Sequence, residues 1–296
     1  MNMMIALVGG QPLPNLIPVR YYQPNNVLLV YTETTKKVYE RLCSSIEPDV
    51  PTYGLKTDSY NVEAITVSLQ DRLQQPDLSS HTFLFNLTGG TKAMALAAYQ
   101  VAQQYNASVL YIESEGKKSR AFYYTWFDHQ LQGMPSELIP GCLTLDDFLN
   151  VYLGVNNWQE YGPGRGEGHP FETALAETLR AAHYEVMIGV KTMNGQIDLD
   201  IVARWDNRFG IVEAKVGENG RKLDGIKQLN NAIRQLGIYT QQFYAITVEP
   251  NQTHDALVAA SGIKVITLPG YQDGTDILNS KDAEQLIDLF NKTLKG

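Results

Sequence analysis

The sequence predicts an α/β protein built from a Rossmann-like N-terminal domain and a second, mixed α/β domain. Two observations favour the Rossmann-like half. Short apolar runs alternate with helical patterns, and runs such as 27–30 (Val-Leu-Leu-Val) lack the polar alternation of a strand that faces water. A third observation is the stretch 154–168, rich in glycine, which separates these elements from a second series. A chain of 296 residues is long enough for two domains of ordinary size.

The N-terminal elements follow a regular order. Strands are expected at 3–8, 27–31, 53–56, 81–86 and 108–113, and helices at 36–46, 59–75 and 91–105. Strands that alternate with helices imply a parallel sheet with right-handed crossovers. An aromatic strand at 121–127 is expected to lie antiparallel at the sheet edge, and 143–153 reads as a short amphipathic helix. We therefore expect one domain over 1–153, a linker over 154–168 and a second domain over 169–296.

Polar loops follow three of the expected strands, at 9–12, 32–35 and 88–92. Ligands of such sheets bind beyond the carboxyl ends of the strands, where these loops meet. The loop from Thr88 to Lys92 opens a helix, so free backbone N–H groups and the Lys92 ammonium can hold a phosphate. A tight turn that needs glycine for its backbone angles explains this loop equally well. Neither the Walker A spacing nor G-x-G-x-x-G is present, so a dinucleotide cofactor is not expected.

The second half predicts a different order of elements. A helix from 169 to 182 precedes a strand at 184–190 and a hairpin over 195–215. A helix at 221–236, a strand at 243–248, a helix at 253–260, a strand at 263–268 and a terminal helix from 281 follow. This αβββαβ core resembles the restriction-endonuclease-like fold.

The hairpin carries the strongest chemical signal. If Asp206 and Asn207 form a two-residue turn, Trp205 opposes Arg208, Asp200 opposes Glu213, and Asp198 opposes Lys215. The period of two puts these acids and Lys215 on one face. Opposed carboxylates repel each other, but they suit Mg²⁺ or Mn²⁺, and an adjacent lysine can stabilise charge that builds on phosphorus. The alternative is a surface hairpin with a solvated ladder of ion pairs.

Two further acids are candidates for the same site. Glu172 lies in the first turn of the expected helix at 169–182, where it could be a metal ligand or could simply complement the helix dipole. Asp198 shares the face of Asp200 and could assist it. The predicted catalytic set is therefore Asp200, Glu213, Lys215, Glu172 and Asp198, and the predicted metal ligands are Asp200, Glu213 and Glu172.

The hairpin motif resembles that of the PD-(D/E)xK nuclease superfamily, with Asp200 followed by Glu213-Ala214-Lys215. The segments 8–15, 30–37 and 86–94 resemble the CARF domain (CRISPR-associated Rossmann fold), in the branch fused to such a nuclease. Family members are homodimers that bind cyclic oligoadenylate across the dimer interface. The resemblance implies that the ligand pocket draws on the three polar loops, with these residues: Gly10, Gln11, Pro12, Thr32, Glu33, Thr34, Thr88, Gly89, Gly90, Thr91 and Lys92.

Composition limits the alternatives. The net charge of −8 does not suit a generic nucleic-acid binder, so any such contact needs a local patch, for which Arg221, Lys222 and Lys227 are candidates. Two cysteines, Cys43 and Cys142, favour a reduced, cytoplasmic location without a disulfide framework. No apolar run reaches the ~20 residues of a membrane span, so no membrane association is expected.

The leading functional hypothesis is an endonuclease of type III CRISPR defence that is activated by cyclic tetra-adenylate. It would cut DNA, RNA or both with Mg²⁺ or Mn²⁺, as a homodimer. A second hypothesis is a regulator that binds cyclic oligoadenylate and whose nuclease-like domain is not catalytic. A third is a ring nuclease that degrades the messenger in the N-terminal pocket, although that pocket has no obvious general base.

Overall fold

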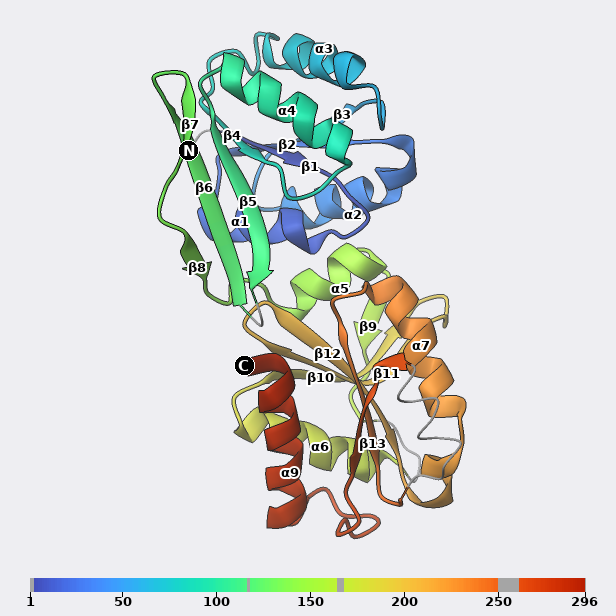
Figure 1. Ribbon diagram of the computed structural model, residues 1–296. Coiled ribbons are helices and arrows are strands. Elements are labelled where there is room, and N and C mark those ends of the chain that lie inside the picture. The colour runs from blue at the N-terminus through green and yellow to red at the C-terminus, as the bar shows by residue number, and fades with distance from the viewer. Residues whose placement is uncertain (1–2, 116–117, 164–167, 250–260, 296) are drawn as a thin grey trace. The chain divides into compact units, whose positions relative to one another are not determined.

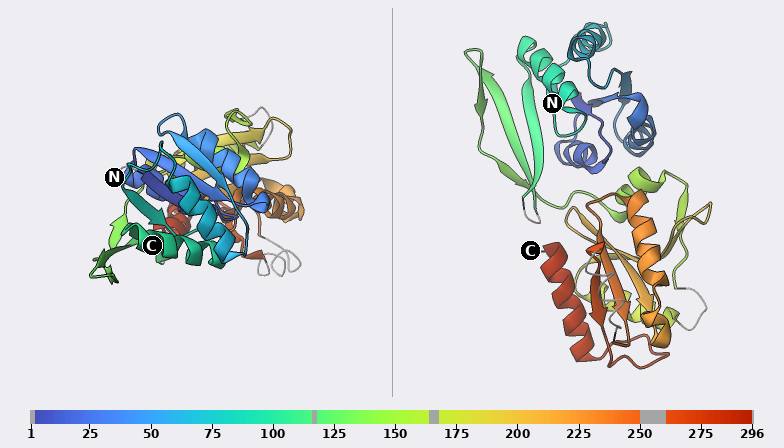
Figure 2. Two further views of the ribbon diagram at one scale, coloured as in Figure 1. Left: turned by 90° about the horizontal axis from the view of Figure 1, so that it is seen from above. Right: turned by 45° about the vertical axis from the view of Figure 1, so that its right-hand side comes forward.

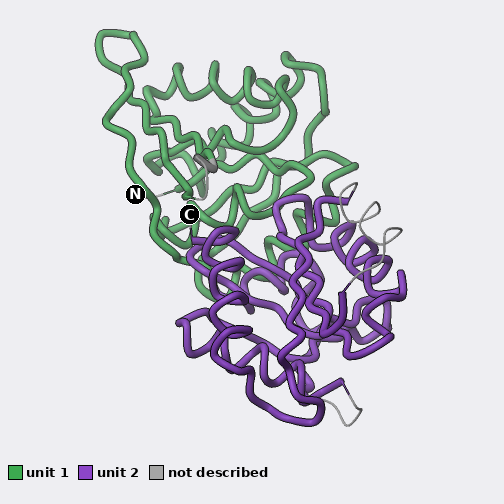
Figure 3. The backbone as a smooth tube through the Cα atoms, turned by 60° about the horizontal axis from the view of Figure 1, so that its bottom comes forward, with its two compact units in different colours: residues 1–143 green, residues 144–296 purple. Residues whose placement is uncertain are grey.

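The computed structural model describes residues 3–115, 118–163, 168–249 and 261–295. They divide into two compact units, Met1–Leu143 and Thr144–Gly296 (Figure 3). Among the described residues, no helix has the length and apolar character needed to cross a membrane.

The first unit is organised around a sheet with the strand order β3-β2-β1-β4-β5-β6-β7 (Figure 1). Its parallel part consists of β1 (Met3–Leu7), β2 (Asn26–Tyr31), β3 (Thr52–Lys56), β4 (Phe83–Asn86) and β5 (Ser108–Glu115). The order reverses between β1 and β4, which is the place where doubly wound sheets bind ligands. The predicted Rossmann-like sheet is confirmed.

Helices cover both faces of this sheet. On one face lie α3 (Val62–Leu73) and α4 (Lys92–Gln104), and on the other lie α1 (Leu13–Tyr22) and α2 (Lys36–Ile46), as two further views also show (Figure 2). Helix α1 was not expected, because Pro14 and Pro18 argue against a helix. Pro14 lies in the first turn, where proline is tolerated, and α1 buries its apolar side chains. Packing therefore overrides local propensity here.

The antiparallel part of the sheet differs from the expectation. Strand β6 (Lys118–Phe127) is antiparallel to β5, as predicted, but it is not the edge. The short strands β7 (Gln130–Gly133) and β8 (Glu137–Ile139) both pair with its other side. Both are largely exposed and too short to show an alternating pattern, so the sequence gives little sign of them.

The second unit is built on a sheet with the order β14-β13-β12-β11-β10-β9. Its strands are β9 (Trp158–Glu160), β10 (Glu185–Thr192), β11 (Asp198–Trp205), β12 (Arg208–Lys215), β13 (Gln241–Ile246) and β14 (Lys264–Thr267). Its helices are α5 (Leu145–Leu153), α6 (His169–Ala181), α7 (Asp224–Leu236) and α9 (Ser280–Phe290). The order from α6 to β13 confirms the predicted αβββαβ core. The helix expected at 253–260 lies outside the described residues.

The division between the units differs from the predicted linker at 154–168. Helix α5, assigned by the sequence to the first domain, packs against β10, β11 and α7 of the second unit. Its Phe148 ring stacks on Phe209 of β12, with 4.2 Å between ring centroids. Strand β9 lies within the predicted linker and pairs with β10. A run of glycines marks irregular backbone, but it does not reveal which core the preceding helix joins.

The core of the second unit holds its hairpin in place. The buried face of α6, with Phe171, Leu175 and Leu179, packs with α9 against apolar residues of β11 and β12. Side chains of the opposite parity on these strands include Asp200, Glu213 and Lys215. The apolar positions thus fix the register that brings the acids together.

Candidate functional site

The predicted ligand loops lie together at the carboxyl ends of β1, β2 and β4. Strands β2 and β4 pair with β1 on either side, so the loops that follow them share one edge of the sheet. The loops after β1 and β4 are in close contact, because a Cβ added at Gly9 would lie 3.1 Å from the backbone nitrogen of Gly90. Gly90 itself has a φ of +72°, which glycine adopts without strain.

A buried amide network, which sequence reasoning did not single out, joins these loops. Asn86 Nδ2 donates to the Pro14 carbonyl (2.9 Å), and its Oδ1 accepts from Thr88 N–H (3.1 Å) and from Thr88 Oγ1 (2.5 Å). Asn15 Nδ2 donates to the Leu7 carbonyl (3.0 Å). Thr88 Oγ1 also accepts from the Ile112 N–H (2.8 Å). The two asparagines are fully buried, so their amides fix the loop backbones rather than meet a ligand.

The predicted pocket residues fall into two groups. Pro12 and Thr32 are buried, and Thr91 caps helix α4: its Oγ1 accepts from Met94 N–H (3.2 Å) and donates to the Ser59 carbonyl (2.6 Å). Their contacts in the structure are with the protein itself. The remaining members are exposed or partly exposed at the sheet edge: Gly10, Gln11, Glu33, Thr34, Thr88, Gly89, Gly90 and Lys92.

Charged side chains also lie at the carboxyl edge of the sheet. Glu33 forms an exposed ion pair with Lys56 from the end of β3 (2.5 Å). Lys92 is the first residue of α4 and is exposed, so its ammonium lies beside the helix N-terminus. A helix N-terminus and a lysine together form a favourable place for a phosphate.

A substitution at Gly89 tests how tightly the loop after β4 is packed. A Cβ at this position would lie 2.1 Å from the Leu7 carbonyl oxygen, a backbone atom that cannot move aside cheaply. We expect Gly89→Ala to lower the free energy of unfolding by about 1–3 kcal/mol, as overpacking does elsewhere. Gly10→Ala is the matched control, because nothing lies within 4 Å of its Cβ position. Chemical denaturation of both variants measures the difference, and equal stability would contradict the close approach.

In the second unit the predicted hairpin register is confirmed. Trp205 pairs with Arg208, and the ladder continues to Ile201 opposite Val212. Asp206 has a φ of +52°, a conformation that aspartate tolerates in a tight turn. Beyond Ile201 the described ladder ends, and the carboxylate of Asp200 accepts a hydrogen bond from the Ala214 N–H (2.7 Å).

Asp200, Glu213 and Lys215 converge where the ladder ends. The Lys215 ammonium lies 3.6 Å from Asp200 Oδ2 and donates a short hydrogen bond to Glu213 Oε1. Glu213 is almost fully buried, with 2% of its side chain exposed. The tyrosine beside it on β13, Tyr244, donates its hydroxyl to the Gly220 carbonyl (3.2 Å).

The electrostatics of this group follow from its burial. Burial, and then the Asp200 charge, raise the pKa of Glu213 to about 8. Burial also raises the pKa of Asp200, against the opposing effect of Lys215. Burial by itself lowers the pKa of Lys215, but the charges of Asp200 and Glu213 leave that pKa above its usual value. Raised pKa values in three adjoining groups, two buried acids and a lysine, are typical of functional sites.

Glu172 and Asp198 lie near this group without joining it. The charges of Glu172 and Asp198 both contribute to the raised pKa of Asp200. Glu172 is bonded to His169 Nδ1 (3.0 Å), and Asp198 forms an ion pair with Lys191 (2.8 Å). Within the described ranges, no three His, Cys, Asp or Glu side chains lie close enough to hold a metal ion together. Among the described residues, the predicted three-carboxylate metal set is therefore not gathered, and Glu172 is hydrogen-bonded to His169 on its own helix.

The donor chemistry of the remaining pair still fits a hard divalent cation. Asp200 and Glu213 offer carboxylate oxygens, the ligand type that Mg²⁺ and Mn²⁺ prefer. Burial of two acids beside each other is unfavourable unless positive charge compensates them, and Lys215 supplies that charge in the structure. An open pocket of about 810 Å³ adjoins the group, and among its lining residues are His169, Glu172, Lys215, Asn219 and Asp273.

The raised pKa of Glu213 gives a prediction for stability. An acid whose folded pKa lies above its unfolded value stabilises the fold below about pH 4.5, and this contribution is lost as the pH rises towards 8. In the presence of a chelator, we expect the unfolding temperature of Glu213→Gln to change less between pH 5 and pH 9 than that of the wild type. Glu284→Gln, at an exposed position of α9, is the control. A pH dependence in Glu213→Gln as steep as in the wild type would contradict the assignment.

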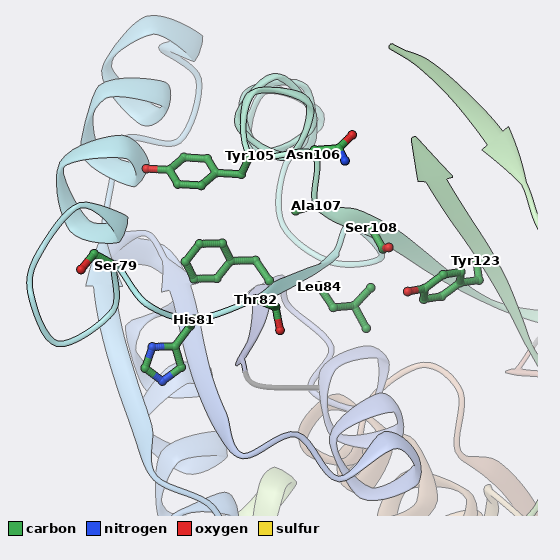
Figure 4. Close-up of a pocket in the computed structure, with 10 residues that line it drawn as sticks. Ser79, His81, Thr82, Leu84, Tyr105, Asn106, Ala107, Ser108 and Tyr123 are labelled. Carbon is green, nitrogen blue, oxygen red and sulfur yellow. The ribbon is translucent and has the colours of Figure 1, made fainter. Parts of the chain in front are cut away.

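A second cavity, of about 390 Å³, lies at the opposite ends of the parallel strands of the first unit (Figure 4). Its lining comes from the amino ends of β4 and β5, with Phe83 and Ser108, and from the preceding loops, with His81 and Asn106. The predicted ligand loops follow the carboxyl ends of the strands, so this cavity is not part of the ligand edge.

A comparison with known protein families identifies the family of the first unit. Residues 3–137 match the family described as the Card1 CARF domain. The N-terminal unit is a Card1-type CARF domain. The loops at 9–12, 32–35 and 88–92 thus lie at the carboxyl edge of a CARF sheet. No curated protein matches the chain.

Solved structures match the chain beyond the CARF domain. Can2 from Sulfobacillus thermosulfidooxidans, in complex with cyclic tetra-adenylate, is 17% identical with a TM-score of 0.75, and the match covers 100% of both chains. Protein VC1899 from Vibrio cholerae is 12% identical with a TM-score of 0.68, over 99% of this chain and 97% of that one. A type III CRISPR defence DNA nuclease activated by cyclic oligoadenylate is 16% identical with a TM-score of 0.66, over 97% of this chain but 51% of that one. These similarities establish a shared fold.

Proposed function

We propose that this chain is a divalent-metal-dependent endonuclease of type III CRISPR defence that cyclic tetra-adenylate activates. The observation that carries the proposal is the convergence of Asp200, Glu213 and Lys215 on adjacent strands of a domain that follows a CARF domain. A surface ladder of ion pairs does not explain this group, because Glu213 is buried and burial raises the pKa of both acids. Support for the activator comes from Can2, whose complex contains that ring.

The catalytic roles follow from the contacts. Asp200 and Glu213 would hold Mg²⁺ or Mn²⁺, which when bound neutralises phosphodiester charge and activates water. Asp200 is fixed by the Ala214 N–H, so its carboxylate keeps one orientation. Lys215 remains charged between the two acids and lies at the pocket, where its ammonium can orient the attacking water and stabilise the charge that builds on phosphorus. Glu172, on the wall of the same pocket, and Asp198 add negative charge near the site.

The sensing role is assigned to the CARF edge. Exposed Lys92 and the N-terminus of α4 suit the phosphates of a cyclic oligoadenylate, and the amide of Gln11 and the hydroxyl of Thr34 suit adenine edges. A two-fold symmetric ring matches a homodimer in which both copies contribute the same loops. The ligand would then shift a two-state equilibrium toward the active nuclease.

Cleavage assays test this function. Labelled DNA and RNA, single-stranded and double-stranded, are incubated with the protein in Mg²⁺ or Mn²⁺, with and without cyclic tetra-adenylate. We expect cleavage of at least one substrate that requires both the metal and the ring and that is lost in Glu213→Gln. Binding of the ring without cleavage of any substrate would instead indicate a regulator. Linear products from labelled ring would indicate a ring nuclease.

A further inference from the structure

Lys191 lies beside the catalytic group on the neighbouring strand. It is on β10, directly opposite Asp198 of β11, and its Nζ lies 2.8 Å from Asp198 Oδ2. About half of each side chain is exposed, 47% for Lys191 and 51% for Asp198. Cross-strand partners face the same way, and Asp198 shares its face with Asp200. Lys191 is therefore on the catalytic face of the sheet.

The charges around Lys191 connect it to the site. Its hydrogen bond to Asp198 raises its pKa, and the charges of Asp198, Asp200 and Glu172 add to that effect, against the smaller effect of its burial. Three of the site's carboxylates thus act on this ammonium. A polyanion that approaches these acids meets repulsion, which a cation at the same place reduces.

The three positive side chains that were predicted as a nucleic-acid patch have partners near them in the sequence. Arg221 pairs with Glu218 (2.7 Å), Lys222 donates to Asn219 Oδ1 (2.6 Å), and Lys227 lies 3.7 Å from Asp224. Arg221 lies on η2 (Gly217–Arg221), Lys227 lies on α7, and Lys222 lies in the two-residue connection between them, so none of the three is on β10 or β11. Lys191, in contrast, pairs with Asp198, which is one of the acids near the site. If the Lys191 ammonium leaves Asp198 for a phosphate, that phosphate is bound on the catalytic face of the sheet.

Distance separates the roles of the two lysines. Lys191 and Lys215 stand on β10 and β12, with β11 between them. Two strand spacings place their backbones about 10 Å apart, so each lysine can serve a different phosphate. A lysine at that distance suits a neighbouring phosphate of the same strand.

Taking the proposed nuclease function as given, we propose that Lys191 is a substrate-positioning residue that leaves Asp198 to bind a backbone phosphate of the nucleic acid next to the scissile one. The Asp198 pair holds the side chain in place when no substrate is bound. An exposed pair of this kind contributes little to stability, so its rearrangement costs little.

Binding of a fluorescein-labelled oligonucleotide, followed by anisotropy in Ca²⁺ over a range of salt concentrations, tests the role. We expect Lys191→Gln to bind about tenfold more weakly at low salt and to show a salt dependence, log Kd against log salt, reduced by about 0.7–0.9. Lys191→Arg should retain most of the wild-type affinity and most of the wild-type salt dependence. Lys281→Gln, the same charge change at an exposed position of α9, is the control. An unchanged slope in Lys191→Gln would overturn the proposal.

A double-mutant cycle separates a phosphate contact from a loss of general charge. Asp198→Asn releases Lys191, so we expect it to strengthen oligonucleotide binding, and most of that gain should disappear in the Lys191→Gln background. Equal gains in both backgrounds would mean that Lys191 does not contact the substrate. Both measurements use binding, so an inactive wild type that still shows the Lys191 effect would contradict the nuclease function and leave the contact standing.

Discussion

Lys215→Ala is expected to lower the rate of nucleic-acid cleavage by about 10²–10³-fold while leaving the affinity for cyclic tetra-adenylate unchanged. The reason lies in its position: the ammonium is bonded to Glu213, lies 3.6 Å from Asp200 and reaches the pocket. Such a loss is the size found when one group that stabilises developing charge is removed from an active site. Single-turnover cleavage at saturating ring and metal measures it.

Removal of Lys215 also leaves two buried carboxylates without their compensating charge, which can destabilise the fold. Lys215→Arg is the control for this destabilisation, because it keeps the positive charge but replaces the compact ammonium with a planar guanidinium. We expect Lys215→Arg to fold like the wild type and still to cleave poorly. Wild-type cleavage rates in Lys215→Ala would rule out the catalytic role of Lys215.

Lys92→Ala is expected to weaken activation strongly and to leave the basal chemistry intact. A charge-assisted hydrogen bond to phosphate contributes about 1.5–3 kcal/mol, and a two-fold ring would lose that contact in both copies. The concentration of cyclic tetra-adenylate that gives half-maximal cleavage should therefore rise by about 10²–10⁴-fold. Titration of the ring against cleavage rate gives this value directly.

The side chain of Lys92 is exposed at the start of α4, so its loss should not disturb the fold. Lys281→Ala, in the other unit, is the matched control for the change in net charge. An unchanged activation curve for Lys92→Ala would contradict the assignment of the ligand edge. A fall in the ligand-free rate of Lys92→Ala would contradict the division of roles between the two units.

The hairpin shows what the sequence could predict. A period of two and a two-residue turn fix the pairing of Trp205 with Arg208, and with it the common face of Asp200, Glu213 and Lys215. These are local rules, and they remain valid because apolar residues at the alternate positions are buried on the opposite face. The three polar loops were predictable for a similar reason, since parallel strands bring their carboxyl ends to one edge.

Other features depend on contacts between distant residues or on side-chain choices. Asn86 bonds to the Pro14 carbonyl across 72 positions of the sequence, and no local pattern announces that contact. Glu172 was expected among the metal ligands, but its nearest bonded partner is His169, three residues before it. Helix α5 was assigned to the wrong unit because an amphipathic pattern shows that a helix is buried, not which core buries it.

The central claim is that Asp200 and Glu213 together bind one divalent cation beside Lys215. Anomalous diffraction from crystals soaked in Mn²⁺, of the wild type and of Glu213→Gln, tests it most directly. We expect one manganese peak in the wild type within bonding distance of both carboxylates, and a weaker or absent peak in the variant. A wild-type peak away from both carboxylates, or no peak with the Lys215 ammonium still between them, would contradict it.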